Sequence, residues 1–273
     1  MASIIHEKQN LLHLRWDEAR KSSGTAGSFL KAYSDLGGKK TYYKLSNYDA
    51  YKGVVGHECV NEIIVDRLLT FLGVEHLSYQ LIHADIFVGG RTLETYLCAS
   101  EDFKRKGDSK VALDSYYQAN KDGGESPMDF CLRMGWERYV YEMLAVDFLI
   151  LNRDRHGANI EVLKNSHDRT VRLAPLFDHG LSFLCRCSSD AEVDAFDPMA
   201  DKPVQCFVGS NSTQKNLEII PKDRMPAFRI PKESDRIALF DGLAPILPQK
   251  WLDKIWEMLR RRWNCYEALR GTR

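Results

Sequence analysis

The sequence has no long apolar run, no net charge and no low-complexity tract. No segment approaches the roughly 18 consecutive apolar residues that a membrane-spanning helix needs, and residues 1–21 lack the apolar stretch of a secretory signal. Lysine plus arginine and aspartate plus glutamate both total 38, so the overall basic field of a dedicated nucleic-acid-binding protein is missing. We therefore expect a cytoplasmic protein with no membrane span and no direct nucleic-acid partner.

The seven cysteines also lack the paired spacing of a zinc site. Their number is odd and they are scattered, with only Cys185 and Cys187 close together. A second close pair, which a tetrahedral zinc site would need, is absent from the sequence. We expect reduced thiols and no disulfide framework.

The chain is large enough for two lobes. Its 273 residues exceed a typical single-core domain, and 44% of them are hydrophobic, which supplies material for a packed core. No internal repeat is present, and β-like patterns give way to helical ones along the chain. We predict an α+β bilobal fold with a β-rich N-terminal lobe over residues 1–100 and a helical C-terminal lobe over residues 101–273.

Alternating patterns and turn residues place the strands in the first lobe. Residues 1–21 fit either a short helix or an extended lead-in. The next elements are two hairpins and, between them, a helix that ends at a glycine. Their ranges are Phe29–Tyr33 and Thr41–Leu45 for the first hairpin, 57–72 for the helix, and Tyr79–Val88 and Thr92–Cys98 for the second hairpin.

The second lobe is predicted to be mainly helical. Apolar residues recur at helical spacing over 137–152 and again over 250–269. Residues 100–128 are polar and indicate a linker between the lobes. Residues 184–230 are polar and irregular, and we expect a loop there that shapes an acceptor site.

Asp154 and Asn159 form the motif most indicative of chemistry. They are five residues apart and directly follow an apolar helical pattern, and Asp178 follows a second apolar run and precedes His179-Gly180. This D-x-x-x-x-N spacing with a later aspartate is typical of the kinase catalytic loop and its metal-binding aspartate. Asp and Asn are also common turn residues, so the motif gains its weight from the β-rich lobe before it.

These residue types suit magnesium-dependent phosphoryl transfer. Mg²⁺ takes carboxylate and amide oxygens and keeps several waters and substrate phosphates. We predict Asn159 and Asp178 as metal ligands and Asp154 as the carboxylate that engages the nucleophile. Asp147 lies on the apolar side of its helix, so we expect it to pair with a nearby polar group.

The first lobe supplies a candidate phosphate lysine. Lys44 ends a strand-like run, and Glu62 lies in the middle of the next helix, where a Lys–Glu pair could form. Glu58, one turn earlier, is the alternative partner. Upstream, the small residues of Ser22–Ser28 let backbone N–H groups approach phosphates, although a flexible linker has the same composition.

Together these motifs resemble the HipA-like family of bacterial serine/threonine kinases. The resemblance spans most of residues 22–265 and is carried by the N-x-D-R-H-x-x-N loop, the L-A-P-L-F-D element and the V-N-E helix. It implies a protein-kinase-like fold related to the phosphatidylinositol kinases. It further implies ATP and Mg²⁺ as cofactors and a protein hydroxyl as acceptor.

The resemblance assigns roles to particular residues. Asp154 becomes the catalytic base, Asn159 and Asp178 the Mg²⁺ ligands, Lys44 the phosphate lysine and Glu62 its partner. A further set is implied to bind the nucleotide or support its site: Ser23, Gly24, Thr25, Ala26 and Gly27 of the phosphate loop, Tyr96 and Cys98 of an inter-lobe hinge over Glu94–Ser100, and His156, which with Arg155 holds the catalytic loop.

Regulation and partners follow from the resemblance only in part. Some family members phosphorylate a hydroxyl in their own nucleotide loop, which makes Ser22, Ser23, Thr25 and Ser28 candidate autophosphorylation sites. The chain is expected to lack the extra N-terminal subdomain of longer members, which counts against toxin–antitoxin pairing. The acceptor and the oligomeric state have no readable signal.

Three other readings stay open. A small-molecule or lipid kinase of the same fold would share every motif above. A metal-dependent hydrolase could use Asp154, His156, Asp178 and His179 as ligands. A catalytically silent binding module would keep the fold without the reaction, although the intact Lys44 and acidic set argue against it.

Overall fold

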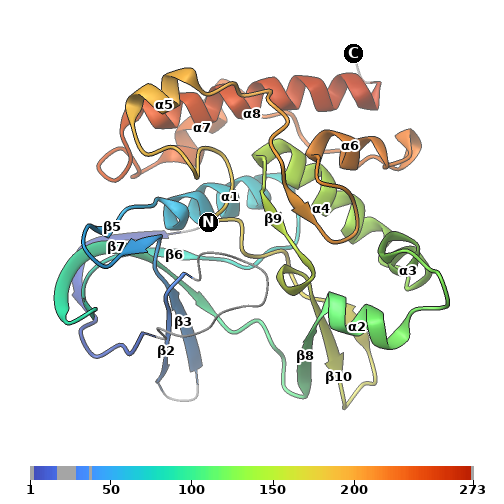
Figure 1. Cartoon of the computed structure of the whole chain (residues 1–273), viewed down its shortest axis with the longest axis horizontal. Helices are drawn as coiled ribbons and strands as arrows, with labels where there is room; N and C mark the ends of the chain where they lie inside the picture. Colours follow the sequence, from blue (N-terminus) through green and yellow to red (C-terminus); the bar gives the residue numbers. More distant parts are fainter. Residues whose placement is uncertain (1–2, 17–28, 37–38, 272–273) are drawn as a thin grey trace.

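The computed structural model describes residues 3–16, 29–36 and 39–271, and these residues form a β-rich lobe and a helical lobe (Figure 1). The first lobe contains a five-stranded sheet in the order β1-β6-β7-β3-β2. Its strands are β1 (Ser3–Asn10), β2 (Lys31–Leu36), β3 (Lys39–Lys44), β6 (Gln80–Val88) and β7 (Arg91–Glu101). The predicted α+β architecture, with a β-rich first lobe and a mainly helical second lobe, is confirmed.

The order of strands reflects how the chain enters the sheet. β1 pairs in parallel with β6, whereas the other neighbouring strands are antiparallel. The ambiguous N-terminal segment is thus an edge strand. Its pairing with a strand 77 positions later, as in Ser3 with Gln80, is a long-range contact that local periodicity cannot reveal.

Both predicted hairpins form with small shifts at their ends. Gly89 and Gly90 connect β6 to β7 with φ values of 57° and 78°, the positive values that a tight two-residue turn requires. Thr41 to Lys44 pair with Glu101 to Cys98, which puts Lys44 beside Cys98 at the centre of the sheet. A minor hairpin, β4 (Tyr48–Asp49) with β5 (Gly53–Val54), precedes the first helix.

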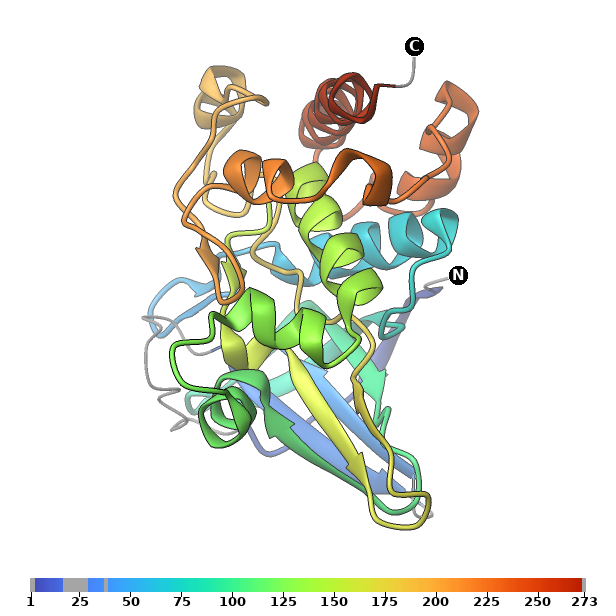
Figure 2. The same cartoon turned by 90° about the vertical axis from the view of Figure 1, so that its right-hand side faces the viewer.

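Helix α1 (Glu58–Leu72) covers one face of the sheet. In Figures 1 and 2 it lies between the sheet and helices α7 and α8. Gly73 ends it with φ of 70° and donates to the carbonyls of Leu69 and Thr70, as the sequence predicted. Because Leu81 and Cys98 face α1 and Leu97 and Ala99 alternate to the other side, the sheet separates a large core from a smaller one.

The helical lobe surrounds α4. Its helices are α2 (Leu113–Asn120), α3 (Pro127–Arg133), α4 (Glu137–Ile150), α5 (Asp190–Ala195), α6 (Thr213–Glu218), α7 (Glu233–Phe240) and α8 (Gln249–Arg270). Its strands are β8 (Asp108–Ala112), β9 (Asp154–Arg155), β10 (Glu161–Asn165), β11 (Val171–Leu173) and β12 (Gln205–Cys206), and two short 3₁₀ turns are η1 (Gly157–Asn159) and η2 (Lys222–Arg224).

Two segments differ from the sequence prediction. Residues 100–128 are not one linker, because β8 pairs with β10 in the second lobe and α2 and α3 follow. The connection that leaves the sheet is short and runs over residues 102–107. Residues 184–230 contain α5 and α6, whose serine N-caps, Ser189 and Ser212, are signals that a search for apolar periodicity does not detect.

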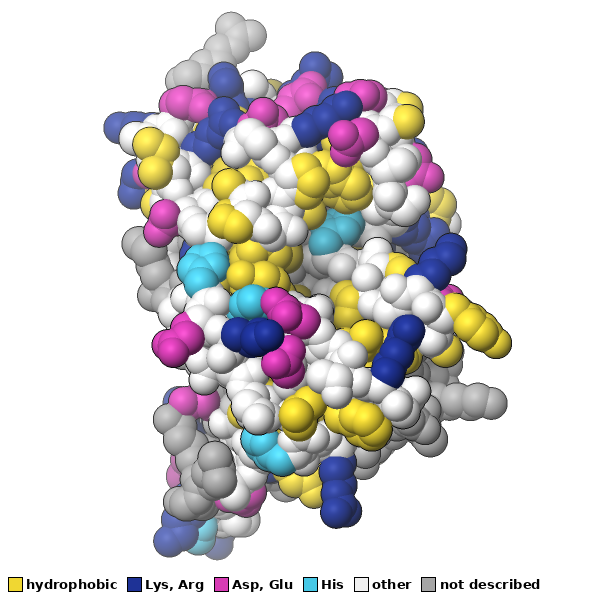
Figure 3. All heavy atoms as spheres, turned by 90° about the vertical axis from the view of Figure 1, so that its left-hand side faces the viewer, with side chains coloured by type: hydrophobic (Ala, Val, Ile, Leu, Met, Phe, Trp, Pro, Cys, Tyr) yellow, Lys and Arg dark blue, Asp and Glu magenta, His cyan; other side chains and the backbone are white. Residues whose placement is uncertain are grey.

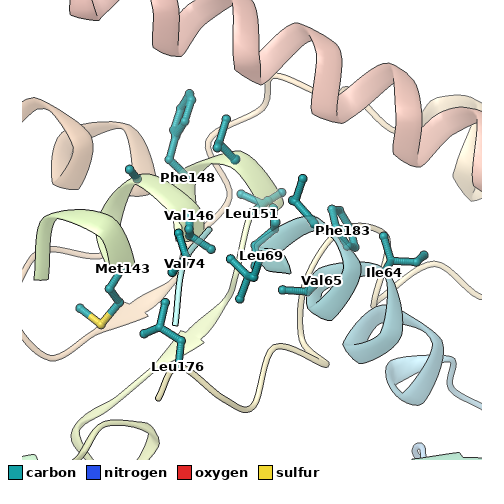
Figure 4. Packing of buried hydrophobic residues seen from close by; sticks show 14 of the residues in the cluster. Ile64, Val65, Leu69, Val74, Met143, Val146, Phe148, Leu151, Leu176 and Phe183 are labelled. Atoms are coloured by element: carbon teal, nitrogen blue, oxygen red, sulfur yellow. The ribbon is translucent and has the colours of Figure 1, made fainter. Parts of the chain in front are cut away.

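One apolar core joins the lobes. Figure 4 shows Val65 and Leu69 of α1, Val146 of α4, and Leu176 and Phe183 from the segment between β11 and α5. All five side chains are at most 1% exposed. Residues far apart in sequence therefore hold α1, α4 and the segment around Asp178 in fixed relative positions.

The surface carries charges of both signs. On the face seen in Figure 3, acidic and basic side chains of the described residues are scattered around apolar ones that gather in the middle of the view. Among the described residues, no helix is long and apolar enough to cross a membrane.

Close packing of Gly157 against the start of α2 can be tested by substitution. A Cβ at this residue would lie 2.5 Å from Asp114 Cβ and 3.0 Å from Asp114 N at the start of α2. We expect Gly157→Ala to lower the free energy of unfolding by about 1–3 kcal/mol in urea titrations, because α2 must move. Gly123→Ala is the matched control, since nothing lies within 4 Å of its added Cβ. Equal stability of the two variants would contradict this packing.

Candidate active site

The loop that carries Asp154 and Asn159 starts where α4 ends. Leu151 terminates α4 in the left-handed region with φ of 51°, and β9 and η1 follow at once. Asn159 donates from Nδ2 to the carbonyl of Asp154 at 2.8 Å. This bond commits the amide nitrogen to the loop and leaves the side-chain oxygen Oδ1 as the atom that can bind a metal.

Arg155 ties this loop to its surroundings. Its guanidinium makes two bonds of 2.9 Å to the carboxylate of Asp147 on α4. It also donates to the carbonyls of Asn159 at 3.2 Å and Phe177 at 3.0 Å. Arg155 is 1% exposed, so the predicted polar partner of Asp147 is a buried, bidentate arginine.

His156 also has a structural position, as predicted. Its Nδ1 accepts a hydrogen bond from the N–H of Ala158 at 3.1 Å, and its Nε2 lies 3.7 Å from Asp154 Oδ1. The ring therefore caps the short 3₁₀ turn η1 and adds a polar neighbour to the Asp154 carboxylate. A role in nucleotide binding stays a prediction.

Lys44, Glu62 and Asp178 meet between the lobes. Lys44 Nζ lies 2.9 Å from Glu62 Oε1 and forms an ion pair with Asp178 Oδ1. The Glu62 side chain has no exposed surface and that of Lys44 is 12% exposed. The predicted preference for Glu62 over Glu58 is confirmed, because Glu58 instead accepts a hydrogen bond from the N–H of Asn47.

Burial and charge act in opposite directions on these three groups. Burial disfavours the charged lysine, but Asp178 and Glu62 raise the pKa of Lys44 well above its usual value. Burial likewise opposes ionisation of Asp178, yet Lys44 holds the pKa of that carboxyl below its usual value. Burial raises the pKa of Glu62, which Lys44 only partly offsets. A firmly charged Lys44–Asp178 pair results.

Helix α1 also forms hydrogen bonds to the residues that follow Asp178. Glu62 Oε2 accepts the N–H of His179 at 2.8 Å. Asn61 donates from Nδ2 to the carbonyls of Gly180 at 2.9 Å and Ser182 at 3.0 Å. The two adjacent polar residues of the V-N-E motif thus position the segment that carries Asp178.

Asp154 has a different environment from Asp178. Burial raises the pKa of Asp154, and the nearby Asp178 adds to this, while His156 opposes it. The pKa values of the two carboxyl groups are therefore shifted in opposite directions, so that Asp178 is firmly ionised and Asp154 is more basic. Such a division is typical of sites where one carboxylate binds a cation and another handles a proton.

The donor set at this site fits Mg²⁺ held together with a nucleotide. Within residues 3–16, 29–36 and 39–271, no group of three or more histidine, cysteine, aspartate or glutamate side chains is arranged to hold a metal ion. One carboxylate and one amide, from Asp178 and Asn159, suit an ion whose other ligands are waters and phosphates. The alternative hydrolase cluster of Asp154, His156, Asp178 and His179 is not assembled there.

The predicted hinge was wrong in position. Glu94–Ser100 lie within β7, where Tyr96 pairs with His83 and Cys98 pairs with both Leu81 and Lys44. The backbone of these residues is used by the sheet, and the ring of Tyr96 stacks on His83 with centroids 4.7 Å apart. Tyr96 and Cys98 are therefore not in a free inter-lobe segment.

The lobes join just after β7. Phe103 lies in this connection, and its ring centroid is 6.0 Å from that of Phe177, the residue before Asp178. This aromatic pair was missed by sequence reasoning, because only the tertiary structure brings residues 74 positions apart together. The predicted phosphate loop, Ser23 to Gly27 with the hydroxyls of Ser22 and Ser28, falls outside the described residues.

Two hollows lie near the lobes. One of about 250 Å³ adjoins the ends of β3 and β7 and is lined in part by Thr41, Tyr79 and Ser100. Another of about 350 Å³ lies between Gly73, Glu137 and Arg224 and touches none of the candidate catalytic residues.

Comparisons with known proteins identify the fold. No protein-family model and no curated protein matches this sequence. Among solved structures, the chain is similar to the Helicobacter pylori proinflammatory kinase CtkA, with a TM-score of 0.61, 14% identity and 97% of each chain covered. The fold is therefore kinase-like.

A HipA protein is also among the matches. It is HipA of Shewanella oneidensis in a complex with HipB and operator DNA, at 14% identity. The match covers 94% of this chain and 60% of that one, and its TM-score of 0.41 is too low for a comparison of individual residues.

The Arg155–Asp147 pair gives a test of what holds the site. We expect Arg155→Ala to lower the free energy of unfolding by about 3–5 kcal/mol, because it leaves the buried carboxylate of Asp147 unpaired. Chemical denaturation of the purified variants measures this loss. Arg138→Ala is the control, since Arg138 pairs with Glu142 on the surface and its side chain is 86% exposed. No measurable change is expected there, and an Arg155 variant as stable as this control would contradict the assignment.

Proposed function

We propose that this protein is an ATP- and Mg²⁺-dependent phosphotransferase that transfers the γ-phosphoryl group of ATP to a serine or threonine hydroxyl of a protein. The observation that carries the proposal is the meeting of Lys44 from β3, Glu62 from α1 and Asp178 from the segment after β11. Three separate elements of a kinase-like fold bring a largely buried cation and two carboxylates to one point. Such a constellation suits binding of nucleotide phosphates.

Each residue has a proposed role. Lys44 binds phosphate oxygens, and Glu62 keeps its ammonium in place. Asp178 and Asn159 would hold Mg²⁺, which when bound neutralises negative charge on the phosphates. Asp154 orients the acceptor hydroxyl and receives its proton, a role that suits a carboxyl whose pKa is raised by burial.

The nucleotide base has a proposed place as well. Residues 101–103 leave the sheet where β7 ends, and the Phe103–Phe177 pair provides an apolar aromatic surface there. We propose that adenine binds against this surface. The loop from Ser23 to Gly27 remains our proposed phosphate cover, and its hydroxyl residues remain the proposed autophosphorylation sites.

The protein acceptor rests on the resemblance of the sequence motifs to HipA-like kinases, and the cytoplasm is the proposed compartment. The alternative of a small-molecule or lipid acceptor uses the same Lys44, Asp154 and Asp178. These two acceptor classes differ in what becomes labelled, so one experiment separates them.

The test is incubation with γ-labelled ATP and Mg²⁺, alone and with a cell extract. We expect label on protein that is lost by at least about 100-fold in Asp154→Asn and Asp178→Asn, because general-base and metal roles each contribute that much or more. Asp168→Asn, which alters an exposed turn carboxylate, is the control and should label normally. Label only on small molecules would favour the alternative, and no ATP binding at all would contradict the proposal.

The raised pKa of Asp154 predicts that this carboxylate, although needed for activity, lowers the stability of the fold. Its folded pKa lies above its reference value of 3.8, so the folded chain holds this proton longer than the unfolded one. The free energy of unfolding falls as the pH rises from the unfolded pKa of this carboxyl to its higher folded pKa. Ionised Asp154 therefore weakens the fold at neutral pH. We expect Asp154→Asn to be inactive but to melt at a slightly higher temperature than the parent at pH 7, with a smaller difference near pH 4. A lower melting temperature at pH 7 would contradict this sign.

A further inference from the structure

The backbone around Asp178 is held from several elements at once. Leu176 exchanges hydrogen bonds with the segment after α1: its N–H donates to Glu75 O at 3.1 Å and its carbonyl accepts Leu77 N–H at 2.8 Å. The carbonyl of Phe177 accepts from Arg155, and the N–H of His179 donates to Glu62. The N–H of Asp178 itself is held by a different group.

That group is the hydroxyl of Tyr79. Its oxygen accepts the N–H of Asp178 at 3.3 Å. Tyr79 is 8% exposed and belongs to the main core, and its own N–H donates to Asp66 Oδ2 on α1 at 2.6 Å. Asp66 is 2% exposed and also lies 3.4 Å from His76 Nε2. The tyrosine is thus anchored at its backbone by α1 while its hydroxyl reaches the candidate metal aspartate.

The conformation of Asp178 explains why such a bond matters. Its φ is 58°, in the left-handed region that costs a non-glycine residue of order 1–2 kcal/mol. A glycine would adopt this backbone freely but has no carboxylate. The carboxylate at this position therefore depends on outside bonds that keep the backbone in its strained form.

We propose that Tyr79 is a positioning residue, whose hydroxyl fixes the left-handed backbone of Asp178 and so aims its carboxylate at the metal and at Lys44. This inference rests on the proposed function, because it assigns Tyr79 to the same Mg²⁺ site. Tyr79 does not touch the reacting atoms. It acts through the N–H of Asp178.

The surroundings keep this hydroxyl neutral. Burial raises the pKa of Tyr79 well above its usual value, and the nearby Glu62 adds to the effect while Lys44 opposes it. A neutral hydroxyl adds no charge to a site that already contains Lys44, Glu62 and Asp178. Tyr79 therefore serves as an acceptor without weakening the Lys44–Asp178 pair.

Tyr79→Phe tests the proposal, because it removes the oxygen and keeps the ring. We expect the Mg²⁺ concentration for half-maximal phosphotransfer at saturating ATP to rise about threefold to tenfold, the effect of losing one hydrogen bond. The purely structural alternative predicts lower stability and an unchanged Mg²⁺ requirement. A half-saturating Mg²⁺ concentration equal to that of the parent would overturn the proposal.

Tyr266→Phe is the matched control. Tyr266 lies on α8 and is also buried. Its hydroxyl donates to the backbone carbonyl of Pro226. This variant should lose stability comparably and leave the Mg²⁺ requirement unchanged. An equal rise in both variants would show a general effect of losing a buried hydroxyl and would also overturn the proposal.

A measurement on the unaltered protein keeps the test independent of the variants. Hydrogen exchange followed by NMR should show the N–H of Asp178 protected to the same degree as that of His179, which Glu62 holds. Rapid exchange at Asp178 alone would refute the bond from Tyr79. If the unaltered protein transfers no phosphoryl group and binds no Mg²⁺ with ATP, the proposed function fails, whereas normal transfer with an unshifted Tyr79→Phe variant defeats only this inference.

Discussion

The charged cluster of Lys44, Asp178 and Glu62 is the interaction on which the relative placement of the two lobes depends. Moving a charged lysine and two carboxylates out of water costs several kcal/mol per ion, so these groups are tolerated only in good geometry. That geometry requires β3, α1 and the segment after β11 to be correctly placed at the same time. The apolar core of α1, α4 and residues 176–183 supplies the placement.

A second buried pair, Arg155 with Asp147, plays the same part for the catalytic loop. It joins α4, the loop and the carbonyl of Phe177, so the position of Asp154 and that of Asp178 are linked through one guanidinium. Strained backbone occurs on both sides of this link, at Leu151 and Asp178. Residues held in such conformations persist where the surroundings over-determine them, which is common at functional sites.

The electrostatic environment gives two chemically similar carboxyl groups different protonation behaviour. Asp178 lies against Lys44 and stays ionised, which suits a cation ligand, whereas half-buried Asp154 has a raised pKa and suits proton handling. The same lysine that stabilises Asp178 is the proposed phosphate ligand. Because that ammonium is already close to Asp178, nucleotide phosphates would enter a site with its cation in position and its charges largely balanced.

Sequence by itself determined the local parts of this protein. Periodicity and glycine signals located α1, α4, α8 and both hairpins, since these depend on neighbouring residues. The spacing from Asp154 to Asn159 and the residues around Asp178 predicted the kinase-like fold and supplied the candidate catalytic residues. The choice of Glu62 followed from its place in the middle of the helix.

Tertiary structure alone decided how distant segments pair. β1 became an edge strand through a partner 77 residues away, and Glu94–Ser100 proved to be a sheet strand instead of a hinge, because β6 and β3 both use its backbone. The partner of Asp147, the Phe103–Phe177 contact and the bond from Tyr79 to Asp178 likewise join residues distant in sequence. No local pattern encodes such contacts, since they arise only when packing of the core brings the segments together.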